Sequence, residues 1–369
     1  MLPLLLTLLA IAPLEVTDYV QPEDCAAARV CDLSPAVDRA LAYCARQALD
    51  PRVGCEIRLP AGRYDLSRPI YLTRVTRLIG AGGWGPFART HLDTSGTGIV
   101  VGRGAAWSEI RDIGLFATGT GTVASYGLEL FGRASVDGVH VDGFVQGVRA
   151  VADASNGGNA DGSVLTRVVV FNSQHTGIFF DRGRVNAGVG LAVYATSNCR
   201  HAARWPQLGA CSNFVDSSFL GNTWIAMHSS QARDVDTGQQ YDAYRFDDPN
   251  QGSVCLGCYR EDNQGLGYIS QWSVAIGGHS AWRGPGLAIL GRTFNGLETQ
   301  AGGTVLRLGL SAGESSAFAA TARGLPALSL RPETNAWRFD LARLNRLVPI
   351  RITSDAQVWL QIPAKVGAP

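Results

Sequence analysis

The sequence predicts an all-β solenoid of short strands that begins with one helix. Glycine makes up 44 of the 369 residues, well above its usual share of ~7%. Frequent glycine without a collagen period is typical of tight bends between short strands. Only one segment has the spacing of an amphipathic helix. A β-rich run, a polar turn residue and a second apolar run recur along the chain with no helix between the copies.

The predicted helix covers residues 33–49. Ser34 is placed to cap the helix, and Pro35 fits its first turn. The apolar residues that share one face are Val37, Leu41, Cys44 and Ala48. Because the first coil of a solenoid has an open strand edge, we expect this helix to cover that edge.

Short extended segments follow the helix directly. "CEIRL" at 55–59 alternates as a strand does, and "PAGRY" is predicted to be a turn. "RPIYL" and "TRLIG" are predicted to be further strands, and "AGGWG" to be a bend. Residues 55–85 are therefore expected to form the first coils.

In the recurring unit, an Asn or Asp at a turn precedes a glycine or alanine four or five residues later. The turn residues are Asp142, Asn172, Asn222 and Asn263. We expect them to stack between coils, because Asn and Asp tolerate the left-handed bend of a coil corner. A β-sandwich is the alternative, but the Asn-Gly and Asp-Gly hairpins that it favours are scarce.

The chain resembles the pectate-lyase-like right-handed parallel β-helix superfamily over roughly residues 30 to 295. The matching segments are "AVDRALAYCA", "IRLPAGRYDLSRPIYL", "TRLIGAGGWG" and "VCLGCYREDNQG". The resemblance implies a right-handed parallel β-helix with an N-terminal capping helix and a small C-terminal β segment. It leaves the activity open, because this superfamily includes lyases, glycoside hydrolases, epimerases and phage tailspikes. The G-H-G and R-I-K motifs of polygalacturonase-like hydrolases and the W-I-D-H motif of pectate lyases are missing.

Three segments are expected along the chain. Residues 1–12 are an apolar run that ends in an A-x-A pattern, which indicates a secretory signal peptide. Residues 13–300 are expected to form the parallel β-helix with its N-terminal cap. Residues 301–369 are expected to form a C-terminal β-rich cap.

The eight cysteines fall into four local couples, which predicts disulfides in an oxidising compartment. The couples are Cys25/Cys31, Cys44/Cys55, Cys199/Cys211 and Cys255/Cys258. A zinc or redox site is the alternative for "CLGC" at 255–258, but no second C-x-x-C or H-x(3–5)-H accompanies it. The couples and the signal peptide together predict a secreted protein, extracellular or periplasmic.

The charge of the chain limits its partners. The formal net charge is +1, so no basic face and no nucleic-acid partner are expected; no membrane partner is expected either. Lys365 is the only lysine, so recognition of a carboxylate would use the planar guanidinium of arginine.

The first candidate site is "YREDN" at 259–263, a polar cluster that ends an apolar strand. Glu261 or Asp262 is a candidate acid or base, Arg260 is a candidate to hold a sugar carboxylate, and Tyr259 is a candidate to stack on a sugar ring. Coils repeat at about 4.8 Å, so carboxylates one or two coils apart match glycosidase geometries. The alternative is a solvated coil corner.

Further candidates lie on other coils. Asp216 is expected on the coil before Glu261 and is a candidate to pair with it. His175, with His140 and His228 on other coils, is a candidate general base. Trp224 and Trp272 are candidate substrate-binding platforms, core packing being the alternative. For Asp216 and His175 the alternative is polar surface.

No cofactor or metal is expected, with one reservation for calcium. "DVDTG" at 234–238 starts like a calcium loop, but Gly238 and Arg245 stand where ligands are required. The function predicted is a secreted carbohydrate-active protein that cleaves an acidic polysaccharide by β-elimination or hydrolysis. The alternative is a glycan-binding adhesin or tailspike-like module without catalysis. The oligomeric state is left open.

Overall fold

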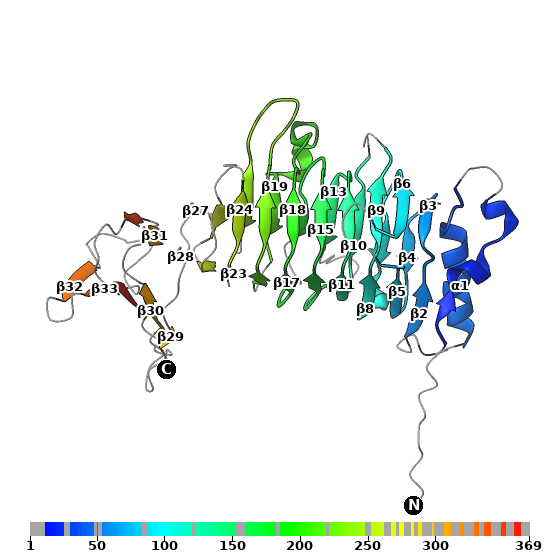
Figure 1. Cartoon of the computed structure of the whole chain (residues 1–369), viewed down its shortest axis with the longest axis horizontal. Coiled ribbons are helices and arrows are strands. Elements are labelled where there is room, and N and C mark those ends of the chain that lie inside the picture. The colour runs from blue at the N-terminus through cyan, green and yellow to red at the C-terminus, as the bar shows by residue number, and fades with distance from the viewer. Residues whose placement is uncertain are drawn as a thin grey trace, which may run out of the picture.

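Each turn of the chain consists of three short strands, and successive turns stack into three long sheets (Figure 1). The computed structural model describes residues 12–276, except for 26–29, 48–49, 51–53, 83–87, 120–122, 152–158, 182–184, 219–220, 248–251, 262–266 and 271–272. Beyond residue 276 it describes only the backbone of the short strands between residues 282 and 362.

The three sheets are named A, B and C in the order in which the chain enters them. Sheet A holds β1 (Leu14–Glu15), β2 (Cys55–Arg58), β5 (Thr76–Ile79), β8 (Ser108–Arg111), β11 (Ala134–Asp137), β14 (Val164–Thr166), β17 (Val189–Leu191), β20 (Thr223–Ile225), β23 (Val254–Leu256), β26 (Val274–Ile276) and β28 (Leu287–Ile289). Sheet B holds β3 (Gly62–Leu66), β6 (Thr90–Thr94), β9 (Gly114–Ala117), β12 (His140–Asp142), β15 (Val169–Phe171), β18 (Tyr194–Thr196), β21 (His228–Ser230) and β24 (Tyr259–Glu261). Sheet C holds β4 (Ile70–Leu72), β7 (Ile99–Val101), β10 (Tyr126–Leu130), β13 (Gln146–Ala150), β16 (Ile178–Phe180), β19 (Ser212–Asp216), β22 (Asp242–Phe246), β25 (Gly267–Ile269) and β27 (Trp282–Arg283).

All pairings among these strands are parallel. Together with right-handed connections between parallel strands, this confirms the predicted right-handed parallel β-helix. One difference concerns "PAGRY", which was predicted to be a turn. Gly62 begins β3 there, and β3 pairs with β6 along its whole length.

The last strands pair differently. β31 (Ala317–Ala320) and β34 (Val348–Arg351) continue sheet A with antiparallel pairing. A separate sheet holds β29 (Leu297–Glu298), β30 (Leu306–Leu310), β32 (Leu328–Arg331), β33 (Ala336–Asp340) and β35 (Val358–Ile362). These strands form the small C-terminal β segment.

The corner between sheets A and B is a single residue in the left-handed backbone region. The corner residues are Asp112, Gly138, Arg167, Ala192, Ala226 and Gly257, with φ between 50° and 64°. The residues two before and one after each corner both face the core, as Ile110 and Ile113 do. Cys255 and Cys258 occupy the equivalent positions, so their disulfide replaces an apolar contact across the corner.

The predicted turn ladder is confirmed in part. Asn172 follows β15 at φ 53°, and its amide donates to the Asp142 carboxylate at 3.0 Å, one coil away. Asn222 was aligned wrongly, because it lies before β20 at the corner between sheets C and A. Asn263 lies outside the described residues. The coil corners share a left-handed backbone conformation but not a residue type. The Asn and Asp pattern in the sequence therefore identified only some of them.

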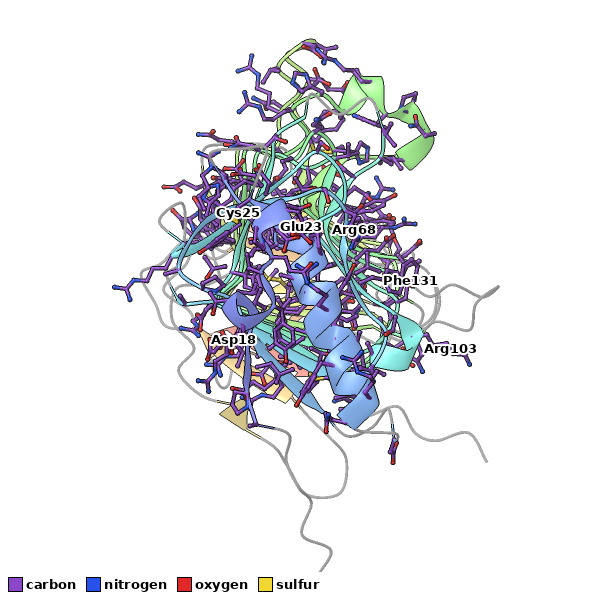
Figure 2. The ribbon with its side chains drawn as sticks, turned by 90° about the vertical axis from the view of Figure 1, so that its right-hand side faces the viewer. Asp18, Glu23, Cys25, Arg68, Arg103 and Phe131 are labelled. Carbon is purple, nitrogen blue, oxygen red and sulfur yellow. A yellow bond between two sulfur atoms is a disulfide. The ribbon has the colours of Figure 1, made fainter. Side chains whose placement is uncertain are left out.

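The helix α1 (Ser34–Gln47) lies across the first end of the coil stack (Figure 2). Its buried apolar residues are Ala36, Val37, Ala40, Leu41 and Cys44, which join the core of the coils. The short helices η1 (Val16–Tyr19) and η2 (Pro22–Asp24) precede it, and β1 pairs with β2. The end of the core is therefore capped, as predicted.

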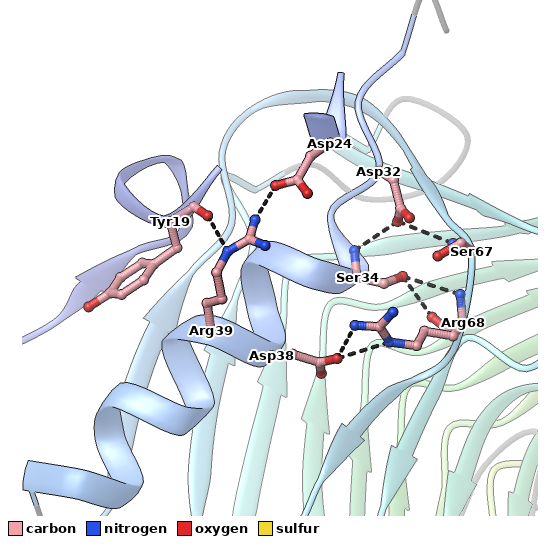
Figure 3. A network of polar contacts seen from close by, with 8 residues as sticks. All are labelled: Tyr19, Asp24, Asp32, Ser34, Asp38, Arg39, Ser67 and Arg68. Atoms are coloured by element: carbon pink, nitrogen blue, oxygen red, sulfur yellow. Dashed lines mark hydrogen bonds and ion pairs between the residues drawn. The ribbon is translucent and has the colours of Figure 1, made fainter. Parts of the chain in front are cut away.

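The cap of α1 differs from the prediction in one detail (Figure 3). The Asp32 carboxylate, not the Ser34 hydroxyl, accepts the backbone N–H of Ser34, and it also accepts that of Ser67. The Ser34 hydroxyl instead donates to the carbonyl of Arg68 at 2.8 Å. Both contacts fasten the start of the helix to the loop between β3 and β4.

All four predicted cysteine couples form disulfides: Cys25–Cys31, Cys44–Cys55, Cys199–Cys211 and Cys255–Cys258. Among the described residues, no helix is long and apolar enough to cross a bilayer. Further short helices lie in the loops: η4 (Arg103–Ala105), η5 (Ala202–Arg204) and η6 (Pro206–Leu208).

Candidate functional site

The outer face of sheet A is an ion-pair ladder over its first coils. Arg77 donates to Glu56 at 2.7 Å and to Glu109 at 2.8 Å, and Arg167 pairs with Asp137 at 2.7 Å. These charges neutralise one another on the surface, where such pairs contribute little to stability. The other two faces hold the more unusual groupings.

The outer face of sheet B carries a continuous row of rings, one from each strand from β6 to β24. The row consists of His91, Phe116, His140, Phe171, Tyr194, His228 and Tyr259. Neighbouring ring centroids lie 3.7 to 5.5 Å apart. The row places two of the three histidines that were grouped by sequence, His140 and His228, on one face.

The predicted residues Tyr259 and Glu261 lie at the end of this row. The Glu261 carboxylate contacts His228 Nε2 at 3.1 Å, and the Tyr259 ring packs edge-on against His228. Glu261 is 47% exposed, so this pair is open to solvent. Arg260 lies between them in β24, pairs in register with the buried Ser229, and is turned to the opposite face. Burial lowers the pKa of Arg260. Arg260, the candidate to hold a sugar carboxylate, therefore does not lie on the face that carries Tyr259 and Glu261.

Asp216 does not lie beside Glu261. It ends β19 in sheet C, where its register partner is Phe246, whereas Glu261 pairs with Ser230 in sheet B. The Asp216 side chain is buried and accepts hydrogen bonds from five groups. They are the backbone N–H and hydroxyl of Ser218, the amide of Asn222, the indole of Trp224 and the hydroxyl of Ser253. The predicted pairing with Glu261 was wrong, because the two strands belong to different sheets.

Trp224 and His175 are also enclosed rather than presented to a ligand. Trp224 is 1% exposed and packs edge-on against Phe180. His175 contacts the Thr176 hydroxyl at 2.9 Å and the Gly209 carbonyl at 3.2 Å. Burial lowers the pKa of His175 to about 4, so its ring is neutral near pH 7. The two remaining predicted site residues, Asp262 and Trp272, lie outside the described residues.

The "DVDTG" loop uses its carboxylates internally. Asp234 accepts the backbone N–H groups of Ala203, Asp236 and Thr237, each at 2.9 Å. Asp236 pairs with His201 and Arg204. Among the described residues, no group of three or more His, Cys, Asp or Glu side chains is arranged to hold a metal ion.

The outer face of sheet C holds a cluster that the sequence analysis missed. Glu129 of β10 stands in register with Arg149 of β13, and Arg149 Nη1 lies 3.2 Å from the carboxylate. The same guanidinium donates to the Tyr126 hydroxyl at 3.0 Å and lies 3.8 Å from Asp181, just after β16. Three consecutive coils therefore contribute to one cluster, and two of its strands, β10 and β13, lie in the middle of the solenoid (Figure 1).

The electrostatics of this cluster are unusual for a carboxylate next to an arginine. Glu129 is 13% exposed, and burial raises the pKa of its carboxyl, which Arg149 only partly opposes. A carboxyl with a raised pKa can hold a proton for transfer to a substrate. Asp181, which lies 3.8 Å from Nη2 of the same guanidinium, is 30% exposed. The cluster thus joins a potential proton donor to a second, more exposed carboxylate.

One signal for this cluster is visible in the sequence. In "YGLEL", Glu129 stands between Leu128 and Leu130, which marks an outward charge on an otherwise buried strand. Its partners could not be identified in the same way. Arg149 and Asp181 are 20 and more residues away, and only the register of the coils brings them together.

Comparisons with known proteins return remote likenesses only. No family model and no curated protein matches the sequence. The catalytic domain of a GH87 α-1,3-glucanase, in complex with tetrasaccharides, is 16% identical over 68% of this chain, with a TM-score of 0.41, and the match spans about half (54%) of its length. The Geobacillus virus E2 protein ORF18 is 12% identical over 97% of this chain and 79% of its own, with a TM-score of 0.46.

An alginate lyase from a Paenibacillus species is 13% identical over 68% of this chain and 92% of its own, with a TM-score of 0.33. At these identities and scores, the likenesses carry no argument about the chemistry of this chain. The candidate site rests on its own geometry.

Proposed function

We propose that the chain is a secreted enzyme that binds an acidic polysaccharide along the outer face of sheet C and hydrolyses a glycosidic bond there. One observation carries the proposal: Arg149 holds a carboxyl with a raised pKa, that of Glu129, and a second carboxylate, that of Asp181, on one exposed face. The four disulfides support secretion, because such bonds persist in oxidising compartments.

The proposed reaction is hydrolysis with two carboxyl groups. Glu129 gives its proton to the glycosidic oxygen as the bond to the anomeric carbon breaks. Asp181 takes a proton from the water whose oxygen attacks that carbon. The two carboxylates lie against different terminal nitrogens of one guanidinium, Nη1 and Nη2. A water between two carboxyl groups is the arrangement of inverting glycosidases, in which these groups are ~6.5–9.5 Å apart. The reaction consumes one water and creates one new reducing end.

Arg149 and Tyr126 supply the preference for an acidic sugar. The guanidinium has a planar fork of donors that matches a carboxylate. Its contact with the Tyr126 hydroxyl and its position 4.9 Å over the Tyr126 ring fix the plane of that fork. Phe179, in register with Arg149, adds partly exposed apolar surface beside it.

A second candidate activity belongs to the His228–Glu261 pair on sheet B. The 3.1 Å contact orients His228, and Tyr194 and Tyr259 pack against its two sides. A histidine held by a carboxylate can remove the proton beside a uronate carboxyl group, and a tyrosine can protonate the leaving oxygen. This set of residues would perform β-elimination, which leaves an unsaturated sugar.

The test is a product assay with residues 13–369 on polygalacturonate, alginate and neutral dextran. It follows new reducing ends and the ultraviolet absorbance of unsaturated uronates. Reducing ends without absorbance on an acidic polymer are expected. Absorbance would transfer the activity to β-elimination and to the sheet B pair. Binding of an acidic polymer with no product would overturn both reactions and identify a glycan-binding module.

A further inference from the structure

Trp107 is an exposed tryptophan with an unusual backbone. Its side chain is 66% exposed, and its φ is 79°. A bulky residue rarely adopts a positive φ, and such conformations gather at binding and catalytic sites. The backbone N–H of Trp107 donates to the Arg133 carbonyl at 2.7 Å, which holds this conformation in place. The backbone conformation thus holds the Trp107 indole exposed to solvent.

Arg133 covers one side of this indole. Its Cζ lies 3.7 Å from the ring centroid, which is a close cation–π contact. Gly162 also lies close to it, since a Cβ atom there would come within 2.9 Å of Arg133 Cζ. The guanidinium thus packs against an aromatic ring and leaves no room for a side chain at Gly162. No described residue accepts a hydrogen bond from it or forms an ion pair with it, unlike Arg149 and Arg167.

Arg133 belongs to the same coil as Glu129 of the proposed active site. Arg133 follows β10 at the corner between sheets C and A, four residues after Glu129. Four residues of extended chain span at most about 13 Å, which is within reach of a neighbouring sugar on a bound polysaccharide. Trp107 belongs to the preceding coil, just before β8. The pair therefore lies at the corner between sheets C and A.

We propose that Trp107 and Arg133 form a subsite for a uronate residue of the polysaccharide. The apolar face of the sugar ring stacks on the side of the indole that Arg133 leaves open. The sugar carboxylate accepts hydrogen bonds from the unpaired edge of the guanidinium, which is already held in one plane. This inference rests on the proposed function, since it assigns a second sugar of the same acidic chain.

The experiment measures binding by calorimetry in a Glu129→Gln background, which prevents turnover. The ligands are tetragalacturonate, tetramannuronate and the carboxyl-reduced, neutral form of each. Arg133→Met is expected to weaken binding of the better acidic ligand at least tenfold and binding of its neutral form less than twofold. Trp107→Ala is expected to weaken both, and Trp107→Phe to preserve most of the affinity.

Arg46→Met is the matched control. Arg46 also lies over an aromatic ring, that of Tyr43, with Cζ 5.9 Å from the centroid, but on the capping helix. It should leave every affinity unchanged. If Trp107→Ala does not fold, Arg133→Met and Trp107→Phe still test the subsite.

Equal affinities for the Glu129→Gln protein with and without Arg133→Met would overturn the subsite, and so would the absence of binding to either acidic ligand. Cleavage that survives Glu129→Gln, together with weakened binding by Arg133→Met, would overturn the proposed active site and leave the subsite standing. The two failures are therefore distinguishable.

Discussion

Arg149 sets the proton affinity of Glu129 in the proposed active site. Burial raises the pKa of Glu129 and the guanidinium opposes it, so Arg149→Met should raise that pKa further. Because a general acid must be protonated, the alkaline limb of the rate profile should move up by about one pH unit or more. The measurement is initial rate against pH.

Arg245→Met is the control for this change. Arg245 lies on the same face of sheet C and pairs with Asp247. Its removal should leave the alkaline limb in place. A limb that does not move in Arg149→Met would show that Glu129 is not the acid.

His175 makes the stability of the fold dependent on pH. Its folded pKa is about 4, below the ~6.5 of an unfolded histidine, so between these values the unfolded chain binds the extra proton. Its contribution is complete above about pH 6.5, and falls by roughly 3 kcal/mol as the pH drops to about 4. Urea unfolding at several pH values should show a shallower loss for His175→Gln than for wild type. Parallel curves would contradict this.

At the same scale, residue chemistry alone was a poor guide to location. The candidate site residues Tyr259 and Glu261 are exposed. Asp216, Trp224 and His175 have the same chemistry as site residues, but they are buried. The residue type shows which chemistry a side chain can perform. The face on which it lies depends on coil boundaries that have no fixed residue type.

At the scale of elements, Asp216 joins strand β19 to the turn before β20. Replacing its carboxylate by an amide in Asp216→Asn places N–H donors against the Asn222 and Trp224 donors. We expect a loss of about 3 kcal/mol in the free energy of unfolding, with the rate per folded molecule unchanged. Denaturant titration and the cleavage assay measure the two quantities.

Asp137→Asn is the matched change on a surface pair. Asp137 pairs with Arg167 on the outer face of sheet A, so its loss should cost less than about 1 kcal/mol. A rate that collapses in folded Asp216→Asn would restore the catalytic role that the sequence suggested.

Strand alternation explains what the sequence could predict of these elements. Alternation and short apolar runs predict strands such as β2 and β5 directly. The glycine-bounded β3 was missed, because Gly62 and Arg63 resemble a turn until β6 pairs with them. To predict the Glu129–Arg149 pair, one has to know the register between β10 and β13. No local sequence pattern contains that information.

At the scale of the whole molecule, stability depends on the N-terminal cap. Burial alone would raise the pKa of Asp32, but hydrogen bonds from Ser67 and Ser34 outweigh it, and the pKa is lowered. Asp32→Ala should therefore cost about 1–2 kcal/mol and lower the thermal midpoint. Asp38→Ala, which removes the exposed pair with Arg68 in the same region (Figure 3), should have a smaller effect. Equal midpoints for the two variants would contradict this account of the cap.

The overall architecture was more predictable than its active face. One helix, frequent glycine and repeated short strands are sufficient to indicate a capped solenoid, because each coil contacts only its neighbours. Which of the three outer faces carries the proposed active site depends on which side chains the stacked coils bring into line. That alignment is a property of the assembled molecule.

The central claim is that sheet C, and not sheet B, carries the cleavage site. The most direct measurement compares the initial rates of Glu129→Gln and Glu261→Gln with wild type on the acidic polymer that is cleaved. The account predicts a loss of about 100-fold or more for Glu129→Gln, since it removes the general acid, and a rate within about twofold for Glu261→Gln, since that change leaves the acid in place. A full rate in Glu129→Gln with a collapse in Glu261→Gln would contradict it and place the chemistry at His228.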